Sequence, residues 1–320
     1  MNDIKIIQYL PLTHPRATLK FVKRLDAKGI MTILDLEDSA QDPFDKNKSR
    51  DLKINARNNF LKLVNSKEWI GDEFKNPVYV RVNSSSTEFF EDDITIVSKI
   101  LKSGFPISGI FLPMVESYRE IEQTISFLSN HNSDKPLEII PMIETLKGME
   151  GLQTLLEYDQ SKNNFSKVHY GHFDYCLDAN LWPFPDPDQS TFWDLVIPMV
   201  ELILSHNKTY VHTPFPFPNN SNLFWAASRH LIKLFPNKDI WVCTLNSELS
   251  ISKEDKNRTT LQINDENISM EEMIKEAKLI KKQFLEGRAN RRSFGISDHR
   301  FIPPHQYFAA EYFLKNFKNK

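Results

Sequence analysis

Short runs of hydrophobic residues recur along the chain and alternate with longer segments that have helical periodicity. Each run is rich in Ile, Val, Leu and aromatic residues and is too brief to form a helix. The eight runs cover residues 4–10, 30–36, 78–83, 109–114, 137–143, 167–171, 208–213 and 240–245. The intervals contain helix candidates over residues 16–28, 46–64, 118–129, 192–205 and 222–234. Because the runs are almost continuously apolar, they are typical of parallel strands that are covered on both faces.

Eight such units in sequence predict an α/β fold, a (β/α)8 TIM barrel. From about residue 253 the chain changes character, with a polar connection, a long helix over 269–286, two prolines and a last helix. We therefore expect a barrel domain over 1–252 and a C-terminal helical extension over 253–320, which could act as a lid on a neighbouring subunit. The last helix has an apolar face at helical spacing, formed by Phe308, Tyr312, Phe313 and Phe317. This face predicts either a homo-oligomer, a trimer or hexamer, or packing against the chain's own barrel.

Composition narrows the classes of partner. Forty basic and 42 acidic residues give a net charge of −2 with both signs scattered, which does not favour a nucleic-acid partner. No apolar stretch is long enough to span a membrane, the N-terminus lacks the pattern of a cleavable signal, and the two cysteines do not have disulfide or metal spacing. The nine glycines form neither a G-x-G-x-x-G turn nor a P-loop, so both common nucleotide cradles are excluded. We expect a cytoplasmic protein that binds no membrane.

Polar residues follow each predicted strand. Barrel enzymes place their chemistry at the carboxyl ends of the strands, because those ends converge on one mouth. The residues at or just after these ends are Thr13, His14, Asp35, Glu37, Asp38, Arg81, Asn83, Glu116, Glu144, His172, Asp174, His212 and Asn246. The pattern predicts an active site there, although any one of these residues could simply mark where a strand meets water.

Five local sequences, taken together and in order, resemble a known family. They are I-L-D-L-E-D-S at 33–39, V-R-V-N at 80–83, L-P-M-V-E-S at 112–117, I-E-T-L-K-G at 143–148 and G-H-F-D at 171–174. This series resembles the motifs of the citrate lyase beta subunit and malyl-coenzyme A lyase family, which belongs to the phosphoenolpyruvate/pyruvate-type TIM barrel superfamily. Further matching positions are Asp42, Lys46, Lys48, Arg50, Gly295, Asp298, Pro303 and Pro304. The resemblance therefore covers nearly the whole chain.

The resemblance implies a magnesium-dependent enzyme that makes or breaks a carbon–carbon bond between a 2-oxo acid and an acyl-thioester enolate. The metal carboxylates would be Glu144 and Asp174, and Arg81 would stabilise the negative charge that develops on the enolate. Glu37 and Asp38 would be the paired acids beside Arg81. Because side chains alternate along a strand, we expect one of these acids to point into the mouth and the other to anchor the loop.

Other positions have roles that are less directly implied. Asp298 would be an acid that the C-terminal segment brings over the mouth of a neighbouring subunit. For Glu116, a helix-capping or supporting role is favoured over direct chemistry. We expect Arg81 and Asn83 to contact substrate, and His14 and His212 either to do so or to make structural hydrogen bonds.

The chain departs from the family pattern at three places. Phe173 stands where an acidic residue usually precedes the second metal ligand, residues 245–246 replace a His-Pro pair, and a proline and phenylalanine tract follows His212. These departures leave open whether the substrate is a coenzyme A thioester, a carrier-protein thioester or a free acid. They also keep two alternatives in view: an acyl-thioester hydrolase on the same scaffold, and a barrel subunit without catalytic activity.

Overall fold

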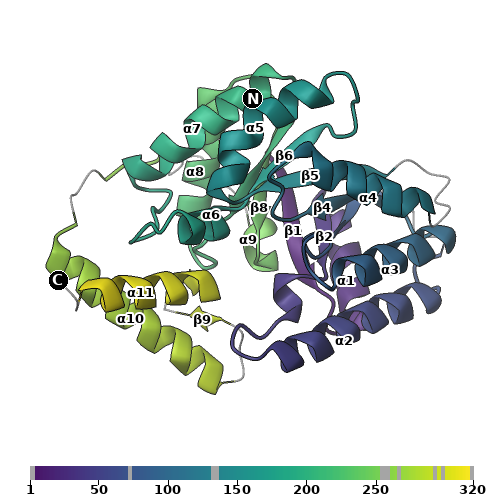
Figure 1. The fold of residues 1–320 in the computed structure, drawn as a ribbon, viewed down its shortest axis with the longest axis horizontal. Coiled ribbons are helices and arrows are strands. Elements are labelled where there is room, and N and C mark those ends of the chain that lie inside the picture. Colours follow the sequence, from purple (N-terminus) through teal and green to yellow (C-terminus); the bar gives the residue numbers. More distant parts are fainter. Residues whose placement is uncertain are drawn as a thin grey trace.

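The computed structural model describes residues 4–70, 74–130, 137–252, 260–264, 268–290, 294–296 and 300–317. Its centre is a closed barrel of eight parallel strands in sequential order, with β8 paired to β1 (Figure 1). The strands are β1 (Lys5–Pro11), β2 (Met31–Asp35), β3 (Val78–Arg81), β4 (Ile107–Leu112), β5 (Glu138–Ile143), β6 (Lys167–Tyr170), β7 (Thr209–Pro214) and β8 (Ile240–Thr244). The eight hydrophobic runs therefore form the eight barrel strands, with ends that differ by no more than two residues. The predicted (β/α)8 fold is confirmed.

Helices alternate with the strands around the barrel. They are α1 (Pro15–Asp26), the short 3₁₀ helix η1 (Asp38–Ala40), α2 (Lys46–Asn65), α3 (Phe90–Lys102), α4 (Tyr118–Asn130), α5 (Leu146–Asp159), α6 (His172–Asp178), α7 (Ser190–Ser205), α8 (Ser221–Leu234) and α9 (Ser247–Ser250). All the helix candidates from the sequence are present within this ring. Five further helices in the described part of the chain, η1, α3, α5, α6 and α9, are not among those candidates.

Side chains fill the inside of the barrel. One buried cluster between the strands consists of Ile7, Tyr9, Met31, Ile33, Tyr79, Phe111, Ile140, Met142, Val211, Trp241 and Cys243. A larger cluster packs the outer faces of the strands against the surrounding helices. The barrel is therefore a packed core rather than a pore.

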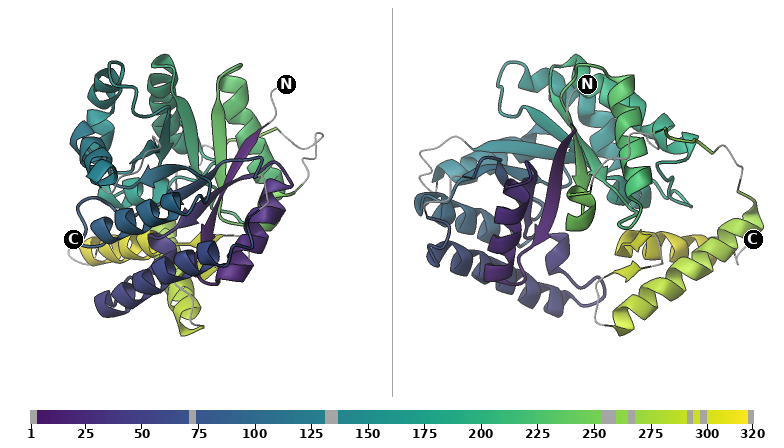
Figure 2. Two further views of the ribbon diagram at one scale, coloured as in Figure 1. Left: turned by 90° about the vertical axis from the view of Figure 1, so that its right-hand side faces the viewer. Right: turned by 180° about the vertical axis from the view of Figure 1, so that it is seen from behind.

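The C-terminal helices lie apart from the ring of barrel helices. Figure 2 shows α10 (Met270–Ala289) and α11 (Pro304–Phe317) grouped at one end of the barrel, with the short hairpin β9 (Gly295–Ile296) and β10 (Phe301–Ile302) beside them. The ring of Phe44, in the loop before α2, contacts those of Phe284, Tyr307 and Phe308. Arg288 on α10 also donates to Asp42 over 2.9 Å. The extension is thus attached to the loop that follows β2.

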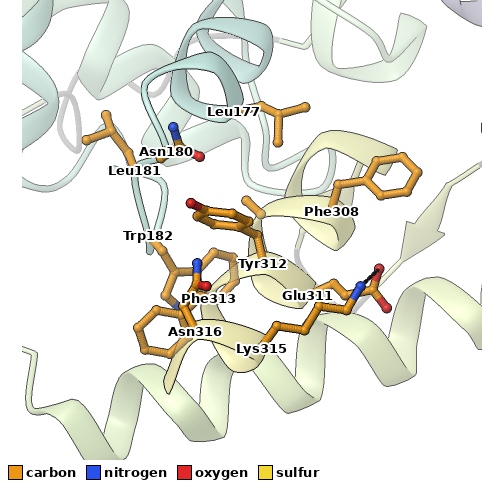
Figure 3. Close-up of a pocket in the computed structure, with 11 residues that line it drawn as sticks. Leu177, Asn180, Leu181, Trp182, Phe308, Glu311, Tyr312, Phe313, Lys315 and Asn316 are labelled. Atoms are coloured by element: carbon orange, nitrogen blue, oxygen red, sulfur yellow. Dashed lines mark ion pairs between the residues drawn. The ribbon is translucent and has the colours of Figure 1, made fainter. Parts of the chain in front are cut away.

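The apolar face of α11 is used in part within the chain. Phe313 stacks on Trp182, with ring centroids 6.0 Å apart, whereas Tyr312 is 55% exposed. A groove of about 420 Å³ runs between α11 and the segment after α6, and Tyr312 projects across it toward that segment (Figure 3). Glu311 and Lys315 form an ion pair along one side of this groove. Of the four side chains on this face, Phe308 and Phe313 therefore pack within the chain, whereas Tyr312 and Phe317 are exposed.

None of the helices in the described residues combines the length and the apolar composition that crossing a membrane requires.

Candidate active site

A cavity of about 720 Å³ opens at the carboxyl ends of the barrel strands. Its polar lining comes from β2, β3, β5 and β6 or the residues just after them, from the first turn of α6 and from the start of α11, and much of its apolar wall comes from the loop after β7 and from the C-terminal segment. The principal polar residues are Asp35, Asp38, Arg81, Glu144, His169, His172, Asp174 and His305. The principal apolar residues are Phe21, Phe173, Pro214, Phe215, Pro218, Leu245, Phe294, Phe301, Pro303 and Pro304.

Arg81 lies at the centre of an ionic cluster. Strand register places Asp35 beside it, and the guanidinium binds both carboxylate oxygens of Asp35, each over 2.7 Å. Its Nη1 also contacts Glu37 over 2.8 Å and Asp38 over 2.9 Å, while its planar face covers the ring of Tyr9 at 4.6 Å. Three carboxylates thus share one guanidinium, so the cluster has excess negative charge. A guanidinium held on both edges has a fixed orientation.

Glu37 and Asp38 both reach Arg81, whereas the expectation that one would point into the mouth and the other anchor the loop rested on the alternation of side chains along a strand. The alternation rule fails because β2 ends at Asp35, and Asp38 already begins η1. Asp38 lines the cavity, whereas Glu37 is not among the lining residues. Burial and the charge of Asp38 raise the pKa of Glu37. Burial also acts on Asp38, but Arg81 and His305 overcome it and lower its pKa, so Asp38 is the stronger acid of the two.

Glu144 and Asp174 meet across the cavity from the end of β5 and the first turn of α6. Glu144 is buried, and the pKa of its carboxyl group is raised well above its usual range by burial and then by the charge of Asp174. Each carboxylate uses one oxygen in the fold: Glu144 Oε1 accepts from the Met114 N–H over 2.7 Å, and Asp174 Oδ1 contacts His305. Within the part of the chain that the structure describes, Glu144 Oε2 and Asp174 Oδ2 make no hydrogen bond or ion pair.

Two backbone features shape the position of Glu144. Met114 has a φ of 57°, a left-handed conformation that is rare outside glycine, and this turn aims its N–H at the carboxylate. Gly171 lies on the other side, where an added Cβ would stand 2.2 Å from Glu144 Oε2. A side chain at position 171 would therefore displace the Glu144 carboxylate, which explains on steric grounds why this position is a glycine.

These two carboxylates suit a hard cation. Their nearness raises the free energy of the charged state, and a bound divalent ion would relieve that repulsion. Magnesium prefers oxygen ligands and usually keeps several waters, so one or two protein carboxylates suffice for it. Among the described residues no three His, Cys, Asp or Glu side chains are arranged to hold a metal together. The protein would thus supply two ligands and leave positions for substrate.

The sequence analysis missed His305. It lies at the start of α11, lines the cavity, and places its Nε2 at 2.9 Å from Asp174 Oδ1. Burial alone would lower the pKa of this imidazole, but Asp174, Asp38 and Glu37 raise it to about 9. The preceding prolines mark the start of a helix, but nothing local in the sequence signals that this helix reaches the mouth.

A second missed residue supports the acidic loop. Lys53, buried on α2, donates to the backbone carbonyl of Glu37 over 3.0 Å and also to the Asn83 side chain. The Asn83 amide group donates in turn to Asp93 and to the carbonyl of Leu36. Asn83 is therefore part of the buried support beneath the loop and does not line the cavity.

The two histidines expected at the mouth lie elsewhere. His14 is exposed at the start of α1, and His212 is buried between Tyr210, whose hydroxyl is 2.9 Å from its Nδ1, and Trp193. Burial lowers the pKa of His212 to about 3, so it is a neutral core residue. Neither lines the cavity, because His14 lies beyond the turn into α1 and His212 faces the helices outside the barrel. Their positions therefore do not favour contact with a substrate in the cavity.

Two acidic candidates remain. The Glu116 carboxylate accepts from Lys147 over 2.7 Å and from Thr145, and it does not line the cavity. Asp298 lies outside the described residues, so its expected role over a neighbouring subunit stays a prediction.

Comparison with protein families identifies one match. The model of the HpcH/HpaI aldolase/citrate lyase family matches residues 6–184, which is more than half of the chain. The chain belongs to this family. The matched region contains Arg81, Glu144 and Asp174, and it confirms the resemblance drawn from the sequence motifs.

Solved structures share the fold at low sequence identity. Malate synthase from Haloferax volcanii, in a ternary complex with pyruvate and acetyl-CoA, superposes with a TM-score of 0.70 at 13% identity, covering 100% of this chain and 92% of that one. The protein CitE from Mycobacterium tuberculosis, in complex with magnesium and acetate, gives a TM-score of 0.55 at 16% identity, over 82% of this chain and 92% of that one. A citrate lyase from Burkholderia xenovorans gives 0.57 at 12% identity, over 100% and 94%. No curated protein sequence matches the chain.

Proposed function

We propose that this protein is a magnesium-dependent carbon–carbon lyase of the aldol or Claisen type. It would cleave a 3-hydroxy acid or 3-hydroxyacyl thioester into a 2-oxo acid and an acid or acyl thioester, or catalyse the reverse condensation. The observation that carries the proposal is a pair of carboxylates in the cavity, Glu144 and Asp174. Each has one oxygen without a hydrogen bond to the described residues, and both share the cavity with Arg81, whose guanidinium Asp35 holds in place. Two findings support the proposal: the chain belongs to the HpcH/HpaI aldolase/citrate lyase family, and CitE structures with the same fold contain magnesium.

Glu144 and Asp174 would hold the ion. Bound magnesium would supply Lewis-acid chemistry and hold the carboxylate and the neighbouring oxygen of the 2-oxo acid. The buried position of Glu144 and the left-handed turn at Met114 keep that carboxylate in place before substrate arrives.

The other charged groups would handle the proton and the enolate. In the cleavage direction Asp38, which lines the cavity and has a lowered pKa, would accept the proton of the substrate hydroxyl. As the hydroxyl oxygen becomes the carbonyl oxygen of the 2-oxo acid, the carbon–carbon bond would break and its electron pair would form the enolate of the departing acid. The proton that Asp38 accepted would then pass to the enolate carbon and complete the product. Arg81 makes four contacts with carboxylates of the described residues, so one of its five guanidinium N–H groups would be left to stabilise the enolate oxygen.

The other substrate would be an acyl thioester. Acetyl-CoA in the malate synthase complex, and coenzyme A with acetoacetate in one CitE complex, support an acyl thioester of coenzyme A or of a carrier protein. The apolar wall of Phe215, Phe301 and Pro304 would exclude water from the enolate.

Replacement of the first metal carboxylate tests the proposal. With Mg²⁺ and a panel of 3-hydroxyacyl thioesters and 3-hydroxy acids, the wild-type protein should release a 2-oxo acid. Glu144→Ala should lower kcat/KM by roughly 100-fold or more, because the ion and its charge stabilisation leave together. Glu116→Ala is the matched control, since that glutamate lies in the loop after the neighbouring strand β4 but pairs with Lys147 outside the cavity. Equal rates for wild type and Glu144→Ala on every substrate that turns over would refute the proposal.

Two further measurements separate the alternatives. A thioester hydrolase would release thiol without any 2-oxo acid, which a thiol reagent detects directly. A barrel without catalytic activity would show no calorimetric signal with Mg²⁺, even when a 2-oxo acid is present.

A further inference from the structure

A short segment of the C-terminal extension is held over the mouth of its own chain. We call residues 300–305 the strap. The Phe301 N–H donates to the Pro216 carbonyl over 2.9 Å, and the Arg300 side chain binds Asp186 over 2.9 Å and Glu276 over 3.2 Å. Pro216 and Asp186 belong to the two proline-rich loops that follow β7 and α6. The loop after β7, which contains Pro216, is one of the places where the sequence departs from the family pattern. In this structure that loop anchors the strap.

Phe173, another of the departures, lies under the end of the strap. Its ring stacks on the His305 imidazole, with centroids 6.4 Å apart and an angle of 14° between the planes. The same ring contacts Phe301 at 6.4 Å. An acidic side chain at position 173 could not provide this apolar surface. The stacking sets the plane of the imidazole, so that Nε2 meets Asp174 Oδ1 at 2.9 Å.

We propose that His305 is a positioning residue for Asp174 in metal binding, delivered by the strap of the same chain. Its Nε2–H would hold Oδ1 and so leave Oδ2 directed at the ion that Glu144 shares. Partners of this kind fix the orientation of a ligand, and their removal typically weakens metal affinity about 10- to 100-fold. This inference rests on the proposed function, because the ion that Asp174 would bind is the proposed magnesium.

Calorimetric titration with MgCl₂, in the absence of any substrate, tests the inference. His305→Ala should weaken Mg²⁺ binding by about tenfold or more, whereas His305→Gln, which keeps an N–H donor at similar reach, should stay within about threefold of wild type. His206→Ala is the matched control, because His206 is a half-buried histidine at the end of α7 that does not line the cavity. Its Mg²⁺ affinity should equal that of wild type.

A merely structural role for His305 would appear in a different readout. If the histidine only fastens the strap, His305→Ala would lower the melting temperature and leave Mg²⁺ affinity unchanged, and this result overturns the inference. Tighter Mg²⁺ binding by His305→Ala overturns it as well, because the imidazole would then compete with the ion. Phe173→Leu provides a second variant in case His305→Ala does not fold: with His305 retained but its stacking surface lost, Mg²⁺ binding should weaken by about threefold to tenfold.

The inference and the proposed function fail in distinguishable ways. A wild-type protein that binds no Mg²⁺ refutes the magnesium-dependent function and the inference with it. A wild-type protein that binds Mg²⁺ as tightly as His305→Ala refutes the inference alone.

Discussion

A single guanidinium organises the acidic side of the site. Arg81 binds Asp35 through two parallel contacts and also touches Glu37 and Asp38, so its position is determined by three partners and by the ring of Tyr9 beneath it. Such a group cannot easily be replaced by a flexible ammonium, which lacks the planar fork.

Arg81→Lys should therefore behave as a severe substitution. The lysine retains a positive charge but cannot bind both oxygens of Asp35 while stabilising an enolate, so we expect kcat/KM to fall by roughly 100-fold. Steady-state kinetics with the substrate found for wild type measures this effect. Arg50→Lys is the control, because Arg50 pairs with Glu88 at the exposed surface. Nearly normal kcat/KM for Arg81→Lys would show that the planar geometry of the guanidinium is not required.

At the scale of elements, helix α2 supports the acidic loop that carries Glu37 and Asp38. Lys53 reaches from this helix to the backbone of Glu37, and its pKa is lowered by burial although Glu37 and Asp38 oppose that effect. The loop between β2 and α2 is thus tied to the helix that follows it. This support explains how adjacent carboxylates outside a strand both keep fixed positions beside Arg81.

Lys53→Met should loosen that loop while preserving side-chain volume. Because a small displacement of reacting groups costs rate, we expect kcat/KM to fall roughly tenfold or more. Kinetics and thermal unfolding should be measured together, with Lys62→Met on the exposed side of the same helix as the control. A loss of stability with unchanged kinetics would mean that Lys53 supports the fold and not the loop geometry.

At the scale of the whole molecule, the C-terminal extension is joined to the barrel by charged contacts as well as aromatic ones. The Asp42 carboxylate is buried and accepts from Arg288 on α10 and from Lys48 on α2. Burial tends to raise the pKa of Asp42, but these hydrogen bonds lower it well below its usual range. The contact therefore links the loop after β2 to the helices that carry His305.

Arg288→Ala should destabilise the protein in a pH-dependent way. At pH 7 we expect a loss of about 1 to 2 kcal/mol in the free energy of unfolding, between the values for exposed and for buried pairs. A group with a depressed pKa in the folded state stabilises the fold above its unfolded pKa, near 4, and loses that contribution as the pH falls further. The difference in the free energy of unfolding between Arg288→Ala and wild type should accordingly become smaller below about pH 4.

Urea denaturation of Arg288→Ala and wild type at a series of pH values measures this difference in the free energy of unfolding. Arg24→Ala, which removes an exposed pair with Glu248, is the control and should cost less than about 1 kcal/mol. A difference that is the same at pH 7 and pH 3 would contradict the assignment to Asp42.

The sequence by itself determined the barrel and which strand ends carry the candidate site residues. Hydrophobic runs reveal parallel strands because such strands are buried on both faces, and residues after each run then converge on one mouth. This reasoning brought Arg81, Glu144 and Asp174 together correctly, since each depends only on the end of its own strand. The family motifs led to the same three residues.

Only the tertiary structure decided which other groups share the mouth. His305 lies 131 residues after Asp174 in the chain, and its approach depends on how α10 and α11 pack across the barrel, which no local pattern specifies. His212 failed as a substrate candidate because its side chain faces the surrounding helices. Local periodicity identifies the elements and their ends, whereas contacts between distant residues arise from packing.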